Sequence, residues 1–578
     1  MSANQPLNDA IIIGIDFGTT RRVAYSREPE EIEMVTSWES ELNHCSDVEK
    51  VPTQLYFEES GRGIKWGYAI SPDKEPLKWF KLLLLEPRDT PSGVASSTQI
   101  QEARRLVNNS NKTPVKIVSI FLRRLWNHSM EAIRRSIGED VMNRSKFRVV
   151  ITLPAIWPPY AQQRMKEAAQ QSGMLNQRSA GTTTLHFVSE PEAAALATIK
   201  DLSKRSSIKV GDTIVVCDAG GGTVDLISYV FLSTDPFVVK ECVKGGGDLC
   251  GGVFLDEAFM RFIKNKSREC TWNAVKKSDK RKFLNDQWEH GIKPQFENQR
   301  RTWPLDLPEN CVRTQSQGLR RRVTLELTSN ELLSVFSPII DKVVNLVSRQ
   351  VNAIQGKHHE KPKSRGNKPW TAVCRGAVVQ GLARHDPTSS LGMSVQARVA
   401  RMSYGINSTT TFTPGVHAEQ DKRWCVKKEA YQAYNQMVWF LTEGDDVSEK
   451  RSVYHNYHYL VEGTAVSITE TIYCSATLPP PARFDPNTVQ RLCEIRWNKT
   501  INANNLPKYT NPSQLTFPKL IYRIRMNCED ETVGFVIHHD GSRVGEQNVE
   551  VQFNYIKPDM KLYQRPRAPL GNVQIWAS

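Results

Sequence analysis

The sequence has no long hydrophobic run, no paired-cysteine motif and no N-terminal leader pattern. No apolar stretch approaches the roughly 18 residues that a membrane-spanning helix requires. The first ten residues have neither a basic start nor an apolar stretch that precedes small residues, as a secretory signal would. We therefore expect a protein that is not secreted and has no membrane partner.

Cysteine is scattered along the chain rather than clustered. The 11 cysteines lie between Cys45 and Cys528, their number is odd, and no two of them are separated by only two residues. This distribution favours reduced thiols, in the cytoplasm or the nucleus, over a disulfide framework or a zinc site.

The charge of the chain is positive but not concentrated. The formal net charge is +14, yet basic and acidic residues are interleaved and no motif of a nucleic-acid-binding module accompanies them. We expect no nucleic-acid partner. The 578 residues, of which 39% are hydrophobic, are too many for one compact core and predict two or more folded units.

The first two-thirds of the chain alternates β-branched runs with helical stretches, which is typical of an α/β fold. A helix is expected over residues 161–172, closed by Gly173, and another, or two shorter ones, over residues 328–350, where apolar residues recur at helical spacing. Buried strands are expected at residues 11–15, 147–153, 213–217 and 224–232.

From about residue 387 the pattern changes to strict alternation of apolar and polar residues. In residues 466–474, 520–526 and 549–553 apolar residues recur with a period of two, and clusters of Pro, Asn, Asp and Gly separate these stretches. This pattern predicts a β-sandwich. We divide the chain into an α/β part, residues 8–386, and a β-rich part, residues 387–578, and expect linkers at residues 88–112 and 358–368.

Two similar segments lie about 200 residues apart, at residues 11–20 and 213–223. Each has a buried strand, then Asp-x-Gly, then a turn that ends in threonine, then a further strand. Two copies in matching surroundings suggest a duplicated lobe. The lobes would face each other, so that the two turns would hold an anionic ligand between them.

The residue types in these turns suit phosphate. Glycine lets backbone N–H groups approach a phosphate without a Cβ in the way, and threonine hydroxyls add donors. An aspartate at the end of each strand, Asp16 and Asp218, can hold Mg²⁺ through its water ligands. Either turn alone would be a common tight turn, and the matched pair carries the prediction.

A third segment, Ser-Glu-Pro-Glu-Ala-Ala-Ala at residues 189–195, begins a helix. Ser189 and Glu192 form a capping box, and Pro191 suits the first turn. The cap does not need Glu190. A carboxylate at this position could orient an attacking water molecule or the water shell of a magnesium ion.

Together these motifs resemble the heat-shock protein 70 family, which has an actin-like ATPase domain with two duplicated, ribonuclease H-like lobes. Residues 16–20 resemble its first phosphate motif, residues 218–225 its second, and residues 189–195 the segment with its catalytic carboxylate. Residues 245–251 resemble a glycine turn, and residues 149–155 and 369–378 resemble the segments of its two connecting helices. The resemblance covers roughly residues 10–385, and the divergent members of the family are the most similar.

The resemblance implies ATP and Mg²⁺ as ligands and assigns roles to individual residues. Asp16 and Asp218 would organise magnesium, and Glu190 would assist hydrolysis together with Asp218 and a lysine, for which Lys81 is the candidate. Glu289 and Lys293 would border the adenine, although at this spacing they could equally be an ordinary ion pair. The phosphate contacts would be Gly18, Thr19, Thr20, Gly220, Gly221, Gly222 and Thr223.

The sequence departs from the family pattern in two places. Arg21 and Arg22 follow Thr20 where the family has small or aromatic residues, and the turn is one residue shorter. These arginines could attract phosphate or distort the hairpin. The adenosine motif, an apolar strand that ends in Gly-Gly, has no counterpart in residues 351–368. Adenine affinity would suffer from such a loss.

Three hypotheses about the chain follow from these observations. The first is an ATP-binding, chaperone-like protein in which nucleotide moves the two lobes, with weak hydrolysis and with polypeptide clients or co-chaperones as partners. The second is an interaction scaffold that keeps the fold without turnover. The third is an incomplete gene-model variant of an active relative. No motif of a sugar kinase is present.

Overall fold

A computed structural model gives the fold of the chain and describes most of its residues. The described residues are 10–18, 20–28, 31–40, 48–58, 63–71, 74–90, 97–155, 157, 159–203, 208–234, 237–267, 269–308, 324–356, 371–385, 393–397, 399–400, 402–447, 452–466, 468–497, 500–529 and 532–550. Within these ranges, no helix combines the length and the apolar character needed to cross a membrane.

The first sheet has the strand order β3-β2-β1-β7-β8, and β4 also pairs with β2. β1 is antiparallel to β2 and parallel to β7, and β7 is parallel to β8. All eight residues of β1 are buried, because helices cover both faces of the sheet. The strands are β1 (Ala10–Phe17), β2 (Thr20–Glu28), β3 (Glu31–Met34), β4 (Val51–Pro52), β7 (Lys146–Leu153) and β8 (Thr184–Ser189).

One face of this sheet packs against the largest hydrophobic cluster, the first core. Side chains from α2, α3, α5 and η2 join those of β1 and β7 in it. The elements on this side are β5 (Leu55–Phe57), β6 (Ile64–Trp66), η1 (Gly67–Ala69), η2 (Phe80–Leu84), η3 (Pro87–Asp89), α2 (Thr98–Asn109), α3 (Pro114–Ile137), α4 (Glu139–Arg144) and α5 (Pro159–Ser172).

Two helices, α6 (Glu190–Ser203) and α12 (Ala372–His385), fill the space between the first sheet and a second one. The second sheet has the order β14-β11-β10-β9, and no described strand pairs with the outer edge of β9. Its strands are β9 (Thr213–Ala219), β10 (Val224–Thr234), β11 (Phe237–Asp248) and β14 (Met393–Ala397).

Glycines allow α6 and α12 to cross closely. A Cβ at Gly376 on α12 would lie 1.6 Å from the carbonyl oxygen of Ala193 on α6. Gly14 on β1 allows the same helix to approach the sheet, since a Cβ there would lie 2.7 Å from the carbonyl oxygen of Cys374. These contacts fix the start of α6, and therefore Glu190, relative to the end of β1.

Helix α11 (Ser329–Gln355) is one continuous helix of 27 residues with Pro338 in its interior. Thr328 and Glu331 form a capping box at its start. Its first half packs against a separate helical core, and its second half packs against the second sheet. The elements around the helical core are α7 (Gly252–Lys266), α8 (Glu269–Ala274), α9 (Lys277–Phe283), the π-helical η4 (Leu284–Ile292), α10 (Lys293–Gln295), β12 (Thr302–Asp306) and β13 (Thr324–Thr328).

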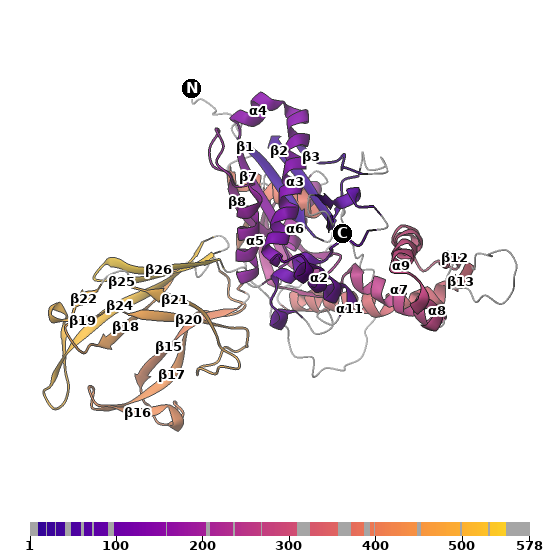
Figure 1. Cartoon of the computed structure of the whole chain (residues 1–578). Coiled ribbons are helices and arrows are strands. Elements are labelled where there is room, and N and C mark those ends of the chain that lie inside the picture. The colour runs from indigo at the N-terminus through magenta and orange to yellow at the C-terminus, as the bar shows by residue number, and fades with distance from the viewer. Residues whose placement is uncertain are drawn as a thin grey trace.

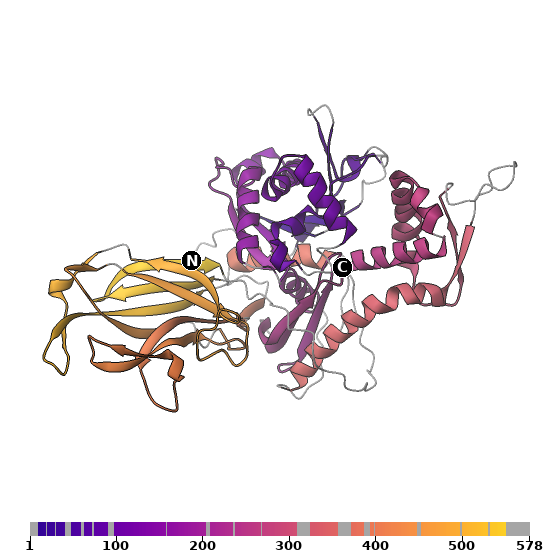
Figure 2. The ribbon, with the colours of Figure 1, turned by 60° about the horizontal axis from the view of Figure 1, so that its bottom comes forward.

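The β-rich part lies to one side of the α/β part, and α7–α9 lie to the other (Figures 1 and 2). Its two largest sheets have the orders β16-β17-β15-β20-β21 and β18-β24-β25-β26, and side chains of both form one core. The elements are β15 (Ser403–Thr411), η7 (Glu419–Asp421), β16 (Lys422–Cys425), β17 (Ala430–Leu441), β18 (Ser452–Leu460), β19 (Ala465–Val466), β20 (Thr469–Ser475), β21 (Gln490–Arg496), β22 (Ile501–Asn502), η8 (Ala503–Asn505), β23 (Lys508–Thr510), β24 (Thr516–Glu529), β25 (Thr532–His539) and β26 (Ser542–Glu550).

The β-rich part contacts the α/β part through β11. Lys244 lies 2.8 Å from Glu443, Lys240 pairs with Asp446, and the side chain of Glu241 accepts a hydrogen bond of 3.0 Å from the N–H of Val399. The opposite end of β11 pairs with the start of β10, beside the second Asp-x-Gly turn.

The mixed α/β fold expected from the sequence is confirmed, and two local predictions are wrong. Residues 88–112 are not a linker, because α2 forms there with Ser97 as its cap. The glycine turn expected over residues 245–251 is shorter, because β11 continues through Gly245, Gly246 and Gly247 to Asp248 and only residues 249–251 connect it to α7. The second linker, residues 358–368, lies outside the described residues. The division at residue 386 stays a prediction, and β14 beyond it still pairs with β11.

Candidate functional site

Two hairpins of the same design join β1 to β2 in the first sheet and β9 to β10 in the second. In the first, Asp16 on β1 lies opposite Arg22 on β2, and in the second, Asp218 on β9 lies opposite Asp225 on β10. The first loop begins at Gly18, after β1, and the second loop is residues 220–223. The N–H of Gly220 donates a 2.9 Å hydrogen bond to the carbonyl oxygen of Thr223 and closes the second loop.

The two hairpins bring four buried carboxylates into one neighbourhood: Asp16, Glu190, Asp218 and Asp225. Burial raises the pKa of Glu190 to about 7, Lys81 opposes the shift, and the negative charges of Asp218 and Asp16 add to it. Burial also raises the pKa of Asp225 well above its ordinary value, with Glu190 and Asp218 as neighbours. Carboxylates affect one another in this way only at short range.

A buried ion pair occupies the centre of this group. Nζ of Lys81, in η2, lies 2.8 Å from Oε1 of Glu190 at the start of α6. Each of the two side chains is 9% exposed. The ammonium also lies 5.1 Å from the ring of Trp157 and 5.7 Å from that of Phe17. The lysine predicted to work with Glu190 therefore contacts it directly.

A second buried ion pair lies at the first hairpin. Nη1 of Arg22 lies 2.9 Å from Oδ2 of Asp16. The hairpin keeps regular pairing from Ile12 to Phe17, so Arg22 does not distort it. The first loop is anchored from outside, since the hydroxyl of Thr53 donates a 2.9 Å hydrogen bond to the carbonyl oxygen of Gly18.

The second loop rests on the start of α7. The N–H groups of Gly252 and Val253 donate hydrogen bonds of 3.1 and 2.8 Å to the carbonyl oxygens of Gly220 and Gly221. A Cβ at Gly251 would lie 2.4 Å from the carbonyl oxygen of Gly220, so this contact requires glycine. The sequence pattern predicts Gly251 only as the last residue of a glycine turn, and the support that Gly251 and Gly252 give to the second loop was missed.

Glu289 and Lys293 are paired with each other and with a third residue. Nζ of Lys293 lies 2.9 Å from Glu289 and 2.8 Å from Asp256, whose other partner is the indole N–H of Trp288 at 2.8 Å. A Cβ at Gly252 would lie 3.5 Å from Nζ of Lys293. This cluster therefore lies beside the segment that supports the second loop, and Asp256 is an addition that the sequence did not suggest.

A pocket of about 280 Å³, which includes space open to solvent, lies between the first core and the helical core. Trp79, Leu82 and Ile100 line it from one side, and Gly222 and Val253 from the other. Gly222 belongs to the second loop. The elements of the first core and those of the helical core thus face each other at the second loop.

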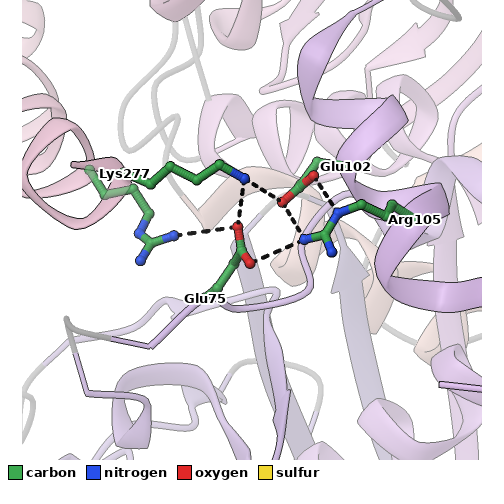
Figure 3. A network of polar contacts seen from close by, with 5 residues as sticks. Glu75, Glu102, Arg105 and Lys277 are labelled. Atoms are coloured by element: carbon green, nitrogen blue, oxygen red, sulfur yellow. Dashed lines mark hydrogen bonds and ion pairs between the residues drawn. The ribbon is translucent and has the colours of Figure 1, made fainter. Parts of the chain in front are cut away.

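A network of ion pairs crosses between the same two parts (Figure 3). On one side, Nη2 of Arg105 lies 3.1 Å from Glu75 and 2.7 Å from Glu102. On the other, Lys277 on α9 lies 3.6 Å from each glutamate, and Arg281 lies 3.7 Å from Glu75. Such exposed pairs stabilise the contact only weakly and are screened by salt.

The structure thus groups Lys81, Glu190, Asp16 and Asp218, and places Gly220, Gly221, Gly222 and Thr223 in one turn. Thr19 lies outside the described residues, as does the side chain of Thr20, whose backbone begins β2. The predicted absence of an adenosine motif also stays a prediction: residues 357–370 are outside the described residues, and residues 351–355 end α11.

The carboxylates of the site only partly suit a magnesium ion. Among the described residues, no three His, Cys, Asp or Glu side chains are arranged to hold a metal directly. A hydrated ion would need free carboxylate oxygens. Asp218 lies near the end of β9, beside the second loop, whereas one oxygen of Asp16 is already bound to a guanidinium. Asp16 therefore does not fit the role of a magnesium organiser while Arg22 holds it.

Two sequence families match separate stretches of the chain. The model of the Hsp70 protein family matches residues 93–361, and a family described as a domain of unknown function matches residues 398–552. The first match includes helix α6, which begins at Glu190, the partner of Lys81, and it includes the second hairpin.

Known relatives carry the same family name. Heat shock 70 kDa protein 12B of Homo sapiens is 25% identical over 317 residues, which are 45% of this chain and 46% of that protein. Heat shock 70 kDa protein 12A of Mus musculus is 25% identical over 328 residues, 46% of this chain and 48% of that protein. The chain therefore spans about half the length of these curated relatives.

The layered sheets, the hairpins and the family match define a mixed α/β protein with the fold of the actin-like ATPases. Over residues 93–361 the chain has the sequence of a divergent member of the heat-shock protein 70 family.

Proposed function

We propose that the chain binds ATP between its first and second loops and hydrolyses it slowly, as a chaperone-like protein whose lobes move with the nucleotide. The buried pair of Lys81 and Glu190, close to Asp16 and Asp218, is the observation that carries this proposal. Burying two charges is costly unless they have a function or excellent partners, and perturbed carboxylates gather at reactive sites.

The geometry supports a division of roles. The backbone N–H groups of the second loop beyond Gly220, whose own N–H closes the loop, would contact phosphate oxygens, and Lys81 would add a positive charge beside them. Glu190, with its pKa near 7, would accept a proton from water or hold that water in place. Glu289 and Lys293, which already form an ion pair, would border the base. Polypeptides or co-chaperones would be the partners.

The finer architecture is part of the same proposal. The two hairpins and their sheets would be duplicated lobes of a ribonuclease H-like kind, and the β-rich part would be a sandwich. The shared core of its two sheets supports the second point. The first sheet continues past β1 with β7 and β8, while no described strand continues the second sheet past β9, which would make the second lobe the smaller copy.

A second candidate is a scaffold that binds nucleotide without turnover. The ion pair between Arg22 and Asp16 favours it, because it occupies a carboxylate that the active form would use. Binding that is accompanied by no phosphate release in the wild-type protein would support the scaffold.

Replacing Asp218 with alanine is expected to weaken ATP binding at least tenfold, because the change removes the buried side chain that lies opposite Asp225 at the base of the second loop and so disturbs the loop. Isothermal titration calorimetry of the full chain with ATP and with ADP, in magnesium buffer, measures this loss. Asp485→Asn, in the β-rich part, serves as the matched control and should bind as the wild type does. Absence of ATP binding by the wild type would refute the proposal.

A further inference from the structure

Arg22 is a buried cation with unused hydrogen-bonding capacity. The residue is only 3% exposed. One of its nitrogens, Nη1, bonds to Asp16, while Nε and Nη2 are buried and have no hydrogen-bond partner among the described residues. A guanidinium presents five N–H donors in a planar fork, so most of this fork is unsatisfied.

Unsatisfied donors of this kind require an explanation. Leaving a buried polar group without a partner destabilises the folded state, and the destabilisation is larger when the group is charged. Folded proteins seldom bury such groups unless a ligand or ordered water completes them. The planar fork of arginine matches the oxygens of a phosphate group particularly well.

The position of Arg22 indicates what that ligand would be. Its partner Asp16 is the next-to-last residue of β1, close to the first loop, and the charge of Asp16 acts on Glu190, the residue paired with Lys81. Arg22 also faces α12, where the charges of both Arg22 and Asp16 act on Cys374. The buried guanidinium therefore lies at the first hairpin, beside Asp16 and on the side of α12.

A second cation lies nearby. Burial and the charge of Arg22 lower the pKa of Lys50 to about 7, while Asp16 and Glu289 oppose the shift. Charges of the first hairpin and the charge of Glu289, beside the helical core, therefore both act on Lys50. An anion bound there would favour the charged form of Lys50 and would meet two positive side chains of the protein.

We propose that Arg22 supplies from the protein the positive charge that a divalent metal otherwise brings to a nucleoside triphosphate, so that the chain binds ATP almost independently of Mg²⁺. This inference rests on the proposed ATP site. Arg22 holds Asp16 with one nitrogen and donates its free N–H groups to phosphate oxygens. The same contact explains why Asp16 does not suit a hydrated metal ion.

The test is the affinity for ATP with and without metal, measured by isothermal titration calorimetry on the full chain. One buffer contains magnesium chloride and the other contains EDTA. We expect the dissociation constants of the wild type in the two buffers to agree within about threefold, since the arginine replaces the metal charge.

Arg22→Gln should separate the two conditions. With the guanidinium removed, ATP affinity in EDTA should fall at least tenfold, and magnesium should restore most of it because Asp16 is then free. Arg22→Lys keeps the charge but has a single side-chain nitrogen, so its loss of ATP affinity in EDTA should be smaller. This variant also keeps a charged partner for the buried Asp16, and it serves as the test if Arg22→Gln folds poorly. Arg135→Gln, on the exposed side of α3, is the control and should match the wild type. Circular dichroism confirms that each variant is folded.

The possible results are distinct. A wild-type protein whose ATP affinity falls tenfold or more in EDTA would refute the inference and leave the proposed function intact. The same metal dependence in the wild type, Arg22→Gln and Arg22→Lys would also refute it. No ATP binding in either buffer would refute both the inference and the proposed function.

Discussion

Replacing Gly376 with alanine is expected to destabilise the α/β part by about 3 kcal/mol or more, at the upper end of overpacking effects. The new Cβ would lie 1.6 Å from the carbonyl oxygen of Ala193 and 2.3 Å from its carbonyl carbon. These are backbone atoms of a neighbouring helix, so no side-chain rotation relieves the clash. α6 and α12 would have to separate, and both sheets pack against them.

A urea titration followed by tryptophan fluorescence measures the loss. Gly356→Ala, at the end of α11, is the matched control, because its nearest atoms would be 3.6 Å away and its φ of −68° suits alanine. We expect the control to keep or slightly raise the midpoint. Equal midpoints for the two variants would mean that the helices do not cross as closely as described.

Replacing Glu190 with glutamine is expected to reduce ATP turnover by about 10²-fold or more, the range for loss of a general base. Glutamine keeps the shape of the side chain and can still accept a hydrogen bond from Lys81. ATP affinity should therefore change only a few-fold. Phosphate release under saturating ATP measures the turnover, with Glu326→Gln on β13 as the control.

The pH dependence of wild-type turnover gives a separate test of Glu190. Because burial raises the pKa of its carboxyl to about 7, the carboxylate form that accepts a proton becomes dominant only above that pH. Turnover should rise as the pH increases from 6 to 8 and then level off. A flat profile, or unchanged turnover in Glu190→Gln, would contradict a role for this residue in hydrolysis.

The local elements of the site could be predicted because short stretches of sequence determine them. The strand at residues 11–15, the Asp-x-Gly turns and the start of α6 at Glu190 each follow from neighbouring residues. The Lys81–Glu190 contact joins residues 109 positions apart, and no local pattern could reveal it. The resemblance to a known family suggested Lys81, and the fold brings it to Glu190.

The errors have physical causes. Residues 88–112 contain few apolar residues, yet Ile100, Ala103 and Val107 lie on one face of α2 and are buried. The polar composition therefore hid a helix whose stability comes from packing one narrow face. The effect of Arg22 was left open, because only the register of the hairpin shows that it faces Asp16.

The proline in the interior of α11 has a mechanical consequence. Pro338 has no N–H, so the carbonyl of Ser334, one turn earlier, loses its helical hydrogen bond, and the helix is weakest there. Leu332 and Phe336 anchor the preceding half in the helical core, while Val343 and Val347 anchor the following half against the second sheet. α11 can therefore bend at Pro338. Such bending would rotate the helical core, with its Glu289–Lys293 pair, relative to the second sheet while both cores stay folded.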